Sequence, residues 1–161
     1  MSGKPTESNS ALSVVFYRSD QHTQAILSAI DLVTLLLRQA PSARSIGEIF
    51  AHIIEVRIKQ LELHSGQEFI SELEPLSSTD TESRDALAAA LEESANCVIN
   101  YLEAELADAN SVLEGQQKVS VLLAHLIAHD AHHRGQILAI LGQNGVEIPE
   151  VVTHGIWEWG V

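Results

Sequence analysis

The chain has 161 residues, the length of one domain, and its formal net charge of −13 leaves too few cations to bind nucleic acid phosphates or an anionic membrane surface. No apolar run approaches the roughly 20 residues that cross a bilayer, and the first residues lack the basic-then-apolar layout of a secretory signal, so we expect a soluble, cytoplasmic protein. The single cysteine, Cys97, excludes an intramolecular disulfide and a site built from several thiolates. We expect Cys97 to be a small buried hydrophobic residue.

The first half of the chain predicts a tail and two helices. Residues 1–9 are polar and aperiodic and predict a flexible N-terminal tail, which leaves residues 10–161 as a single domain. Apolar residues at helical spacing predict a helix over residues 11–39, which Pro41 ends; they are Val15, Ile26, Ile30, Val33 and Leu37. The run SIGE at residues 45–48 matches a capping box and predicts a second helix that ends near residue 64, before Gly66.

The second half predicts a loop, two longer helices and an apolar tail. Residues 69–79 contain Pro75 and predict a connecting loop, after which Thr79 or Asp80 is expected to cap a helix that ends near residue 108. A further helix over about residues 116–143 ends at the Asn144-Gly145 pair. Residues 146–161 are apolar enough to pack back on the bundle. Four helices with short connections predict an all-α fold, an antiparallel four-helix bundle.

The last predicted helix contains four histidines in the apolar segment LLAHLIAHDAHHRGQILAILG, residues 122–142. His125, His129 and His133 recur every fourth residue and therefore form a stripe on one face, on the same side as Leu122, Leu126 and Ile140. Neutral imidazole is a common ligand of transition metals, and two histidines one turn apart can bind a single ion. The stripe, with His132 beside it, predicts a metal site inside the bundle rather than a set of unrelated core histidines.

Two ligands from one helix leave a metal site incomplete, so a third must come from another part of the chain. The remaining histidines are His22, His52, His64 and His154. His52 is the strongest candidate because it shares a predicted inward face with three apolar residues of its helix, Ile49, Val56 and Leu63. His64 lies near a helix end, and His22 and His154 are expected to be exposed.

Other groups near the stripe have ordinary roles in this interpretation. Glu55, Asp130 and Gln136 could orient imidazoles or bound water, but we expect each to make a solvent or packing hydrogen bond and assign none as catalytic. A di-iron bundle would need paired glutamates with E-x-x-H elements on two helices, and the sequence lacks them.

The last predicted helix is apolar on more of its circumference than one bundle core requires. Leu123, Ile127 and Leu138 occupy one further side. A stripe of small residues occupies another; it consists of Ala124, Ala128, Ala131, Gly135 and Ala139. Little of this helix is therefore expected to be exposed. Either a homodimer interface or the C-terminal tail would cover it.

Two segments resemble the DinB-like family, also called the DinB/YfiT-like metalloenzymes. HDAHHRGQILAILGQNG, residues 129–145, is similar to the last-helix signature of that family, and IGEIFAHIIEVR, residues 46–57, is similar to its second-helix element. The resemblance covers the whole bundle. It implies an up-down-down-up four-helix bundle, often dimeric, with one divalent ion held by His52, His129 and His133 and open to water. His125 would then lie above the ion, and His132 would point partly away.

The resemblance also implies a range of functions. Characterised relatives of the fold include thiol-dependent transferases and isomerases that use bacillithiol, mycothiol or glutathione. We therefore expect a metal-dependent enzyme that activates a low-molecular-weight thiol for transfer to a small electrophilic substrate, or that activates water for hydrolysis. The alternative is a non-catalytic metal-binding or stress-response interaction protein, or a helical assembly whose histidines are pH-dependent core groups. Nitrogen ligands suit zinc or nickel first, and iron or manganese next.

Overall fold

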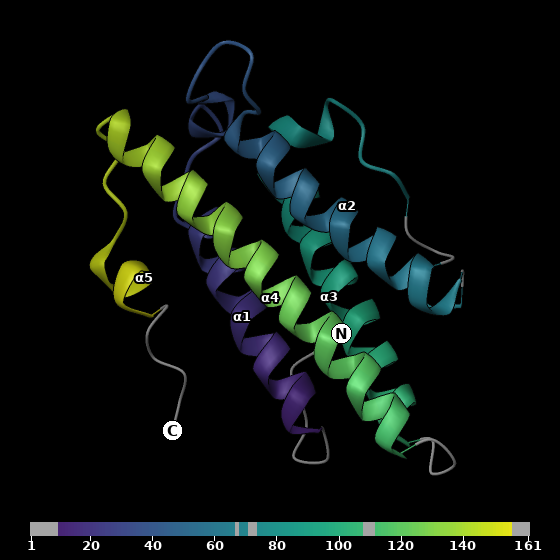
Figure 1. Ribbon diagram of the computed structural model, residues 1–161. Helices are drawn as coiled ribbons and strands as arrows, with labels where there is room; N and C mark the ends of the chain where they lie inside the picture. Colours follow the sequence, from purple (N-terminus) through teal and green to yellow (C-terminus); the bar gives the residue numbers. More distant parts are fainter. Residues whose placement is uncertain (1–9, 67, 71–73, 108–111, 156–161) are drawn as a thin grey trace.

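The computed structural model describes residues 10–66, 68–70, 74–107 and 112–155, and within these ranges its regular structure is helical (Figure 1). The main helices are α1 (Ala11–Ser28), α2 (Ile46–Ser65), α3 (Arg84–Ala107) and α4 (Val112–Gln143). Three short helices accompany them: η1 (Thr34–Leu36), η2 (Asp80–Glu82) and α5 (Glu150–Gly155). The predicted all-α four-helix bundle is confirmed. The tail predicted for residues 1–9 lies outside the described residues, as do Trp157 and Trp159.

The arrangement of the helices explains which of them can share a site. α1 and α2 each pack against both α3 and α4, so α1 and α2 occupy opposite corners of the bundle. The ribbon shows α1 and α4 running in one direction and α2 and α3 in the other, the up-down-down-up order that the family resemblance implies (Figure 1). The connection between α2 and α3 returns along the bundle and is therefore longer than predicted. α2 and α4 become antiparallel neighbours.

The start and end of α2 follow the sequence prediction closely. The hydroxyl of Ser45 accepts a hydrogen bond from the Glu48 backbone N–H at 3.2 Å, and the Glu48 carboxylate accepts one from the Ser45 backbone N–H at 2.6 Å. This reciprocal capping box satisfies two amides that the first turn leaves without helical partners. Gly66, with φ of 63°, ends the helix in a conformation that residues with a Cβ atom rarely adopt.

The predicted helix over residues 11–39 is wrong in its second half, because α1 ends at Ser28. The Asp31 carboxylate accepts hydrogen bonds from the backbone N–H and the hydroxyl of Thr34, at 2.8 and 2.6 Å, and so stabilises a turn in place of a continued helix. Val33 is 73% exposed. The predicted cap of α3 is also wrong: Ser83, not Thr79 or Asp80, accepts the hydrogen bond from the Ala86 backbone N–H.

The start of α4 lies at Val112, four residues before the predicted position, and its end at Gln143 is as predicted. The chain then turns at Gly145, and its apolar residues pack back on the bundle as expected. Val146, Ile148 and Val152 are half-buried against the core, and α5 contacts α1. None of the helices in the described ranges combines the length and apolarity needed to cross a membrane.

The core consists of two apolar clusters, one towards each end of the bundle. The first includes Ile26, Phe50, Leu91 and Ile137, and the second includes Phe16, Leu61, Val98 and Leu126. Cys97 is half-buried against the second cluster rather than fully buried.

Between the two clusters, each main helix contributes a buried polar residue. These residues, Asp20, Arg57, Ser94 and Asp130 with Arg134, are called the polar layer below. The layer crosses the bundle at the level of the α4 histidines and gives the core a charged centre.

Candidate metal centre

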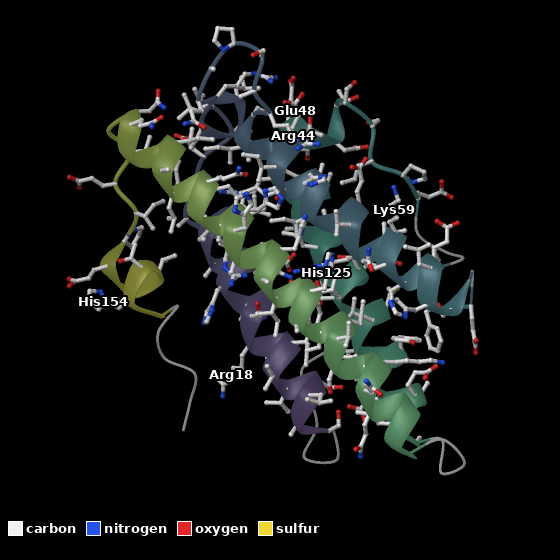
Figure 2. The ribbon with its side chains drawn as sticks, viewed as in Figure 1. Arg18, Arg44, Glu48, Lys59, His125 and His154 are labelled. Carbon is white, nitrogen blue, oxygen red and sulfur yellow. The ribbon has the colours of Figure 1, made fainter. Side chains whose placement is uncertain are left out.

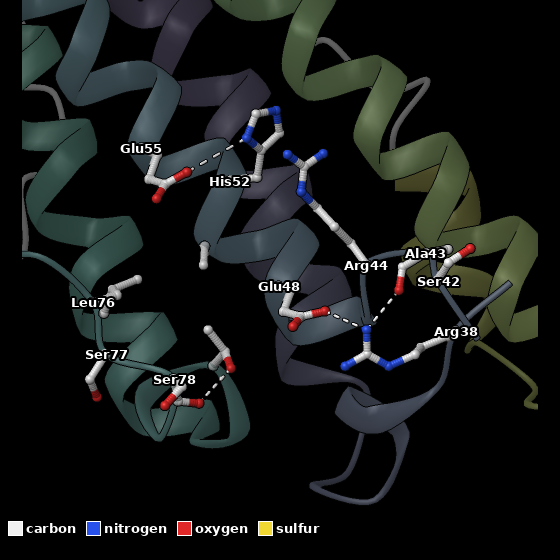
Figure 3. A pocket seen from close by; sticks show the side chains of 12 residues that line it. Arg38, Ser42, Ala43, Arg44, Glu48, His52, Glu55, Leu76, Ser77 and Ser78 are labelled. Atoms are coloured by element: carbon white, nitrogen blue, oxygen red, sulfur yellow. Dashed lines mark hydrogen bonds and ion pairs between the residues drawn. The ribbon is translucent and has the colours of Figure 1, made fainter. Parts of the chain in front are cut away.

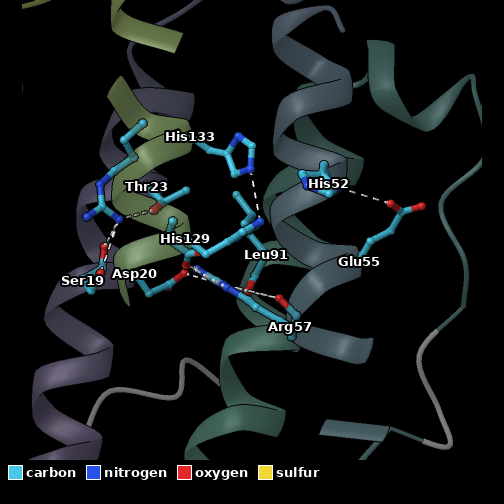
Figure 4. A network of polar contacts seen from close by, with 12 residues as sticks. Ser19, Asp20, Thr23, His52, Glu55, Arg57, Leu91, His129 and His133 are labelled. Carbon is cyan, nitrogen blue, oxygen red and sulfur yellow. Dashed lines mark hydrogen bonds and ion pairs between the residues drawn. The ribbon is translucent and has the colours of Figure 1, made fainter. Parts of the chain in front are cut away.

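Three of the eight histidines meet between α2 and α4, and they are called the histidine cluster below (Figure 4). His129 and His133 lie one turn apart on α4, with ring centroids 4.4 Å apart. His52 faces them from α2, with its centroid 5.2 Å from that of His129 and 4.9 Å from that of His133. One nitrogen from each ring lies within 4.8 Å of the others. In the described part of the chain, no other group of three histidine, cysteine or acidic residues comes close enough to hold an ion.

Each ring has an oxygen atom near its Nδ1, which leaves Nε2 free to bind an ion. His133 Nδ1 lies 2.7 Å from Gln136 Oε1, His129 Nδ1 lies 3.5 Å from Asp130 Oδ1, and His52 Nδ1 lies 3.7 Å from Glu55 Oε2. An Nδ1–H that donates to an oxygen fixes the tautomer whose Nε2 carries a lone pair. The three residues considered as orienting groups from the sequence therefore each lie against a different imidazole.

The spacing of the Nε2 atoms fits a metal ion. His129 Nε2 and His133 Nε2 are 3.1 Å apart. When both Nδ1 atoms carry the proton, two lone pairs face each other across this gap, an arrangement that favours a cation between them. Two nitrogens on one tetrahedral zinc ion, each about 2.0–2.1 Å from it, would be about 3.3 Å apart. The donor chemistry and the spacing agree.

Burial keeps part of the cluster neutral. It lowers the pKa of His133 below the ordinary 6.5, and the neighbouring rings His129, His52 and His132 lower it further, against a hydrogen bond with Gln136. The pKa of His52 is lowered by burial first and then by the positive charge of Arg44. A histidine must be deprotonated at the nitrogen that binds a metal, so these shifts keep both rings competent as ligands at neutral pH.

The DinB family model matches residues 6–158 of the chain. The chain belongs to the DinB family. This finding confirms the resemblance seen in the sequence, and it covers every helix that contributes to the histidine cluster and the polar layer. Comparison with curated proteins and with solved structures yields no match.

The polar layer of this DinB protein is organised around Arg57. Its side chain is fully buried, with Nη1 2.8 Å from Asp20 Oδ1 and Nη2 2.6 Å from Asp130 Oδ2. Its Nη1 also lies 3.4 Å from the Leu91 carbonyl oxygen and from Ser94 Oγ, and its guanidinium carbon is 5.2 Å from the Phe16 ring centroid. Arg57 on α2 is thus held by groups from all three other main helices.

Asp130 connects the polar layer to the histidine cluster. Its Oδ2 accepts two hydrogen bonds from Arg57, while its Oδ1 lies against His129 Nδ1. Burial alone would raise the pKa of Asp130, but the charge of Arg57 and the hydrogen bonds from His129 and Arg57 outweigh it and lower the pKa. Asp130 is therefore a buried carboxylate with a structural and an orienting contact.

Neither Arg57 nor Asp20 was predicted from the sequence to have a role. The available signal was the register of α2: residue 57 follows Ile53 by four and precedes Leu61 by four, and both of these are buried. A charged residue on such a face needs buried partners of opposite charge. Arg134, in the same motif as His133, is also buried and donates to Ser19 and Thr23, which ties α4 to α1.

The prediction that His52 belongs with the α4 histidines agrees with their positions, although its argument was partly wrong. Leu63 is 71% exposed and does not define an inward face. The buried face of α2 instead runs through Ile46, Phe50, Ile53 and Arg57. His52 lies at the edge of that face, half-buried, where α2 meets α4.

The other histidines stay outside the cluster. His125 is exposed on α4 (Figure 2) and stacks on His129, with centroids 6.1 Å apart and ring planes 16° apart; His132 is exposed beside His133. His154 on α5 is exposed as expected. The expectation for His22 is wrong, because its side chain is buried between α1 and the end of α5, near Gly155.

A cavity of about 430 Å³ opens beside His52 (Figure 3). Its walls are α2, the segment before α2 and the segment around η2. The lining includes Arg38, Ser42, Arg44, Glu48, His52, Glu55, Ser77 and Ser78. His52 is the member of the histidine cluster that lines this cavity.

Proposed function

We propose that this DinB protein is a metal-dependent enzyme that binds one divalent ion through His52, His129 and His133 and activates a low-molecular-weight thiol for transfer to an electrophilic small molecule. The observation that carries the proposal is the convergence of three imidazole nitrogens within 4.8 Å, without a carboxylate in the set. Zinc or nickel is the expected ion, with iron or manganese next.

The all-nitrogen donor set supports catalysis over a sealed structural role. Three neutral ligands leave the ion its full charge and at least one position for an exchangeable group. When bound, a divalent ion there would lower the pKa of a thiol or a water molecule. The protein contributes orientation: Gln136 and Asp130 fix the α4 rings, and Glu55 lies against His52.

The cavity beside His52 also supports a transferase reaction. A thiol loses its proton, its sulfur forms a bond to an electrophilic carbon, and the leaving group departs from that carbon with the bonding electrons. We expect the electrophile to bind in the cavity of about 430 Å³ beside His52. Hydrolysis is the second candidate, with water in place of the thiol.

Elemental analysis of the purified protein and of three single variants tests the metal site. We expect about one ion per chain in the wild type, and its loss in His52→Ala and His133→Ala. His132→Ala is the matched control, because His132 is an exposed neighbour on the same helix and should leave the ion in place. A metal-free wild type after reconstitution with zinc or nickel would overturn the proposal.

A second measurement separates the enzyme from a non-catalytic metal-binding protein. Bacillithiol, mycothiol and glutathione are each mixed with 1-chloro-2,4-dinitrobenzene and the metal-loaded protein, and formation of the thioether is followed by absorbance. We expect a rate above background with at least one thiol, and its loss in His133→Ala. Stoichiometric metal without turnover of this electrophile or of a carboxylic ester would favour the interaction protein.

A further inference from the structure

Arg44 is a cationic side chain beside the histidine cluster to which the proposed metal site gives no role. It lies one residue before the helix cap Ser45, and its guanidinium points towards the His52 imidazole on the side of α4 (Figure 3). Within the described ranges, no carboxylate is within ion-pairing distance of it. The neighbouring Arg38, in contrast, is paired with Glu48 at 2.7 Å and donates to the Ala43 carbonyl oxygen at 2.6 Å.

The position of Arg44 is set by the segment that carries it. The Ile46 backbone N–H donates to the Leu37 carbonyl oxygen at 3.0 Å, and Arg38 and Ser45 form a β-bridge, so residues 38–45 are a loop closed at its base. Arg38 ties the inside of this loop to Glu48. The loop therefore holds Arg44 at the mouth of the cavity rather than leaving it on an unrestrained surface segment.

Electrostatics makes this position unusual. Only nine of the 161 residues are lysine or arginine, yet two of them line this one cavity. Among the described residues, no carboxylate offsets the charge of Arg44, whether or not the histidine cluster holds an ion, and a divalent ion there would add repulsion. Neither carboxylate that lines the cavity neutralises Arg44. Glu48 is paired with Arg38, and the Glu55 side chain, which is 76% exposed, lies near His52 Nδ1. An anionic ligand would offset both positive charges.

We infer that Arg44 binds the carboxylate or phosphate of a small anionic substrate or cosubstrate whose reacting group lies at the histidine cluster. A guanidinium donates two parallel hydrogen bonds to either kind of oxyanion. The position of the reacting group rests on the proposed function, whereas the oxyanion site at Arg44 does not. Neutral thiols and neutral electrophiles should bind more weakly than their anionic counterparts.

The oxyanion site is tested first, without reference to a metal. The protein as purified is labelled with ¹⁵N, and the arginine Nε–Hε signals are followed at constant ionic strength during titration with succinate, inorganic phosphate or neutral succinamide. We expect a saturable shift of the Arg44 signal, identified by its loss in Arg44→Gln, with succinate or phosphate and none with succinamide. The more tightly bound anion distinguishes carboxylate from phosphate. Equal shifts at Arg44 and Arg18, or no saturable shift with either anion, would overturn the inference.

The relation to the histidine cluster is tested with two thiols that differ in one charge. Binding of 3-mercaptopropionate and of 3-mercapto-1-propanol to cobalt-loaded protein is measured from the absorption band that arises when the sulfur of the thiol binds cobalt. Because Arg44 is exposed, we expect a modest preference for the anionic thiol, about three- to tenfold. The preference should disappear in Arg44→Gln and remain in Lys118→Gln, which removes the same charge about four turns before His133 on α4.

The outcomes separate the two hypotheses. Equal affinities for both thiols in the wild type would show that the anionic end does not reach Arg44 while the other end is at the cluster, and would overturn that part of the inference. Absence of a cobalt–thiol signal with either thiol would count against the proposed thiol chemistry, while the shift of the Arg44 signal would still decide whether the oxyanion site exists.

Discussion

Arg57 and Asp130 form an ion pair from which solvent is excluded: Arg57 Nη2 lies 2.6 Å from Asp130 Oδ2, and both side chains are 0% exposed. Because the other oxygen of Asp130 lies against His129, the same carboxylate that neutralises a buried charge also orients a ring of the histidine cluster. The stability of the bundle and the geometry of its candidate metal centre therefore depend on one group.

Substitution of Arg57 by methionine should destabilise the protein by about 3–5 kcal/mol, because it leaves Asp20 and Asp130 buried without their counter-charge. The free energy of unfolding in urea measures the effect. Arg38→Met is the control: the Arg38–Glu48 pair is about 40% exposed, so breaking it should cost about 1 kcal/mol or less. Similar losses in the two variants would contradict the importance assigned to the polar layer.

Gln136 should affect metal affinity without affecting the fold, because it is exposed and accepts from His133 Nδ1 at 2.7 Å. Gln136→Met removes the acceptor and should weaken zinc binding about tenfold, whereas Gln136→Glu keeps an acceptor and should match or exceed the wild type. Competition with a chromophoric chelator gives the affinities, and Gln143→Met, on the exposed end of α4, is the control. Equal affinities for all four proteins would show that this contact does not orient His133.

His22 should make stability depend on pH. Burial, and then the positive charges of Arg134 and Arg18, lower its pKa below 6.5, although a backbone hydrogen bond with Gly155 opposes the shift. As pH falls below 6.5, His22 takes up a proton in the unfolded chain but not in the folded protein. Its contribution to stability is therefore fully present above pH 6.5 and decreases as pH falls from 6.5 to the lowered pKa of the folded state.

The comparison of wild type with His22→Gln isolates that effect. Between about pH 7.5 and 5.5, the wild type should lose stability faster than the variant, with a difference in slope of at most about 1.4 kcal/mol per pH unit. The lowered pKa values of His52 and His133 act equally in both proteins and cancel. Parallel stability curves from urea unfolding at each pH would refute the assignment to His22.

We still expect a homodimer, as predicted from the sequence, with the outer face of α4 as its interface. The helix is more exposed than predicted: the small residues Ala124, Ala128, Ala131, Gly135 and Ala139 all face solvent, and Val121 is 65% exposed. Sedimentation should give about twice the 17.5 kDa chain mass. Ala128→Glu should reduce it to one chain, whereas Ala104→Glu on the exposed side of α3 should not. A wild type that sediments as a single chain would contradict the prediction.

The features that could be predicted from the sequence are those fixed by neighbouring residues. The capping box of Ser45 and Glu48 and the stop at Gly66 involve contacts within a few positions, so their residue types identify them. The α4 stripe follows from helical period alone. In contrast, the end of α1 depends on a side-chain hydrogen bond from Thr34 to Asp31, which the apolar spacing over residues 26–37 does not reveal.

Contacts between distant segments account for what the sequence did not reveal. Helical period places Arg57 on a buried face, but its partners Asp20 and Asp130 lie on two other helices, and their proximity follows only from the packing. Arg44 is likewise remote in sequence from α4, and its relation to the cluster depends on the closed loop before α2. The metal-ligand prediction for His52, His129 and His133 remains to be tested by elemental analysis.

Two parts of the site lie on separate elements: the closed loop over residues 38–45 lines the cavity, and α2 and α4 carry the histidine cluster. Because the loop is joined at its base by the Leu37–Ile46 hydrogen bond and the Arg38–Ser45 bridge, its tip at residues 40–43 can change in length or sequence while the first turn of α2 keeps its place. The cavity wall is thus free to diverge independently of the histidines. Exchange of a few residues at the tip should therefore change which small molecules the cavity accepts and leave the helices of the histidine cluster and the charged centre of the core intact.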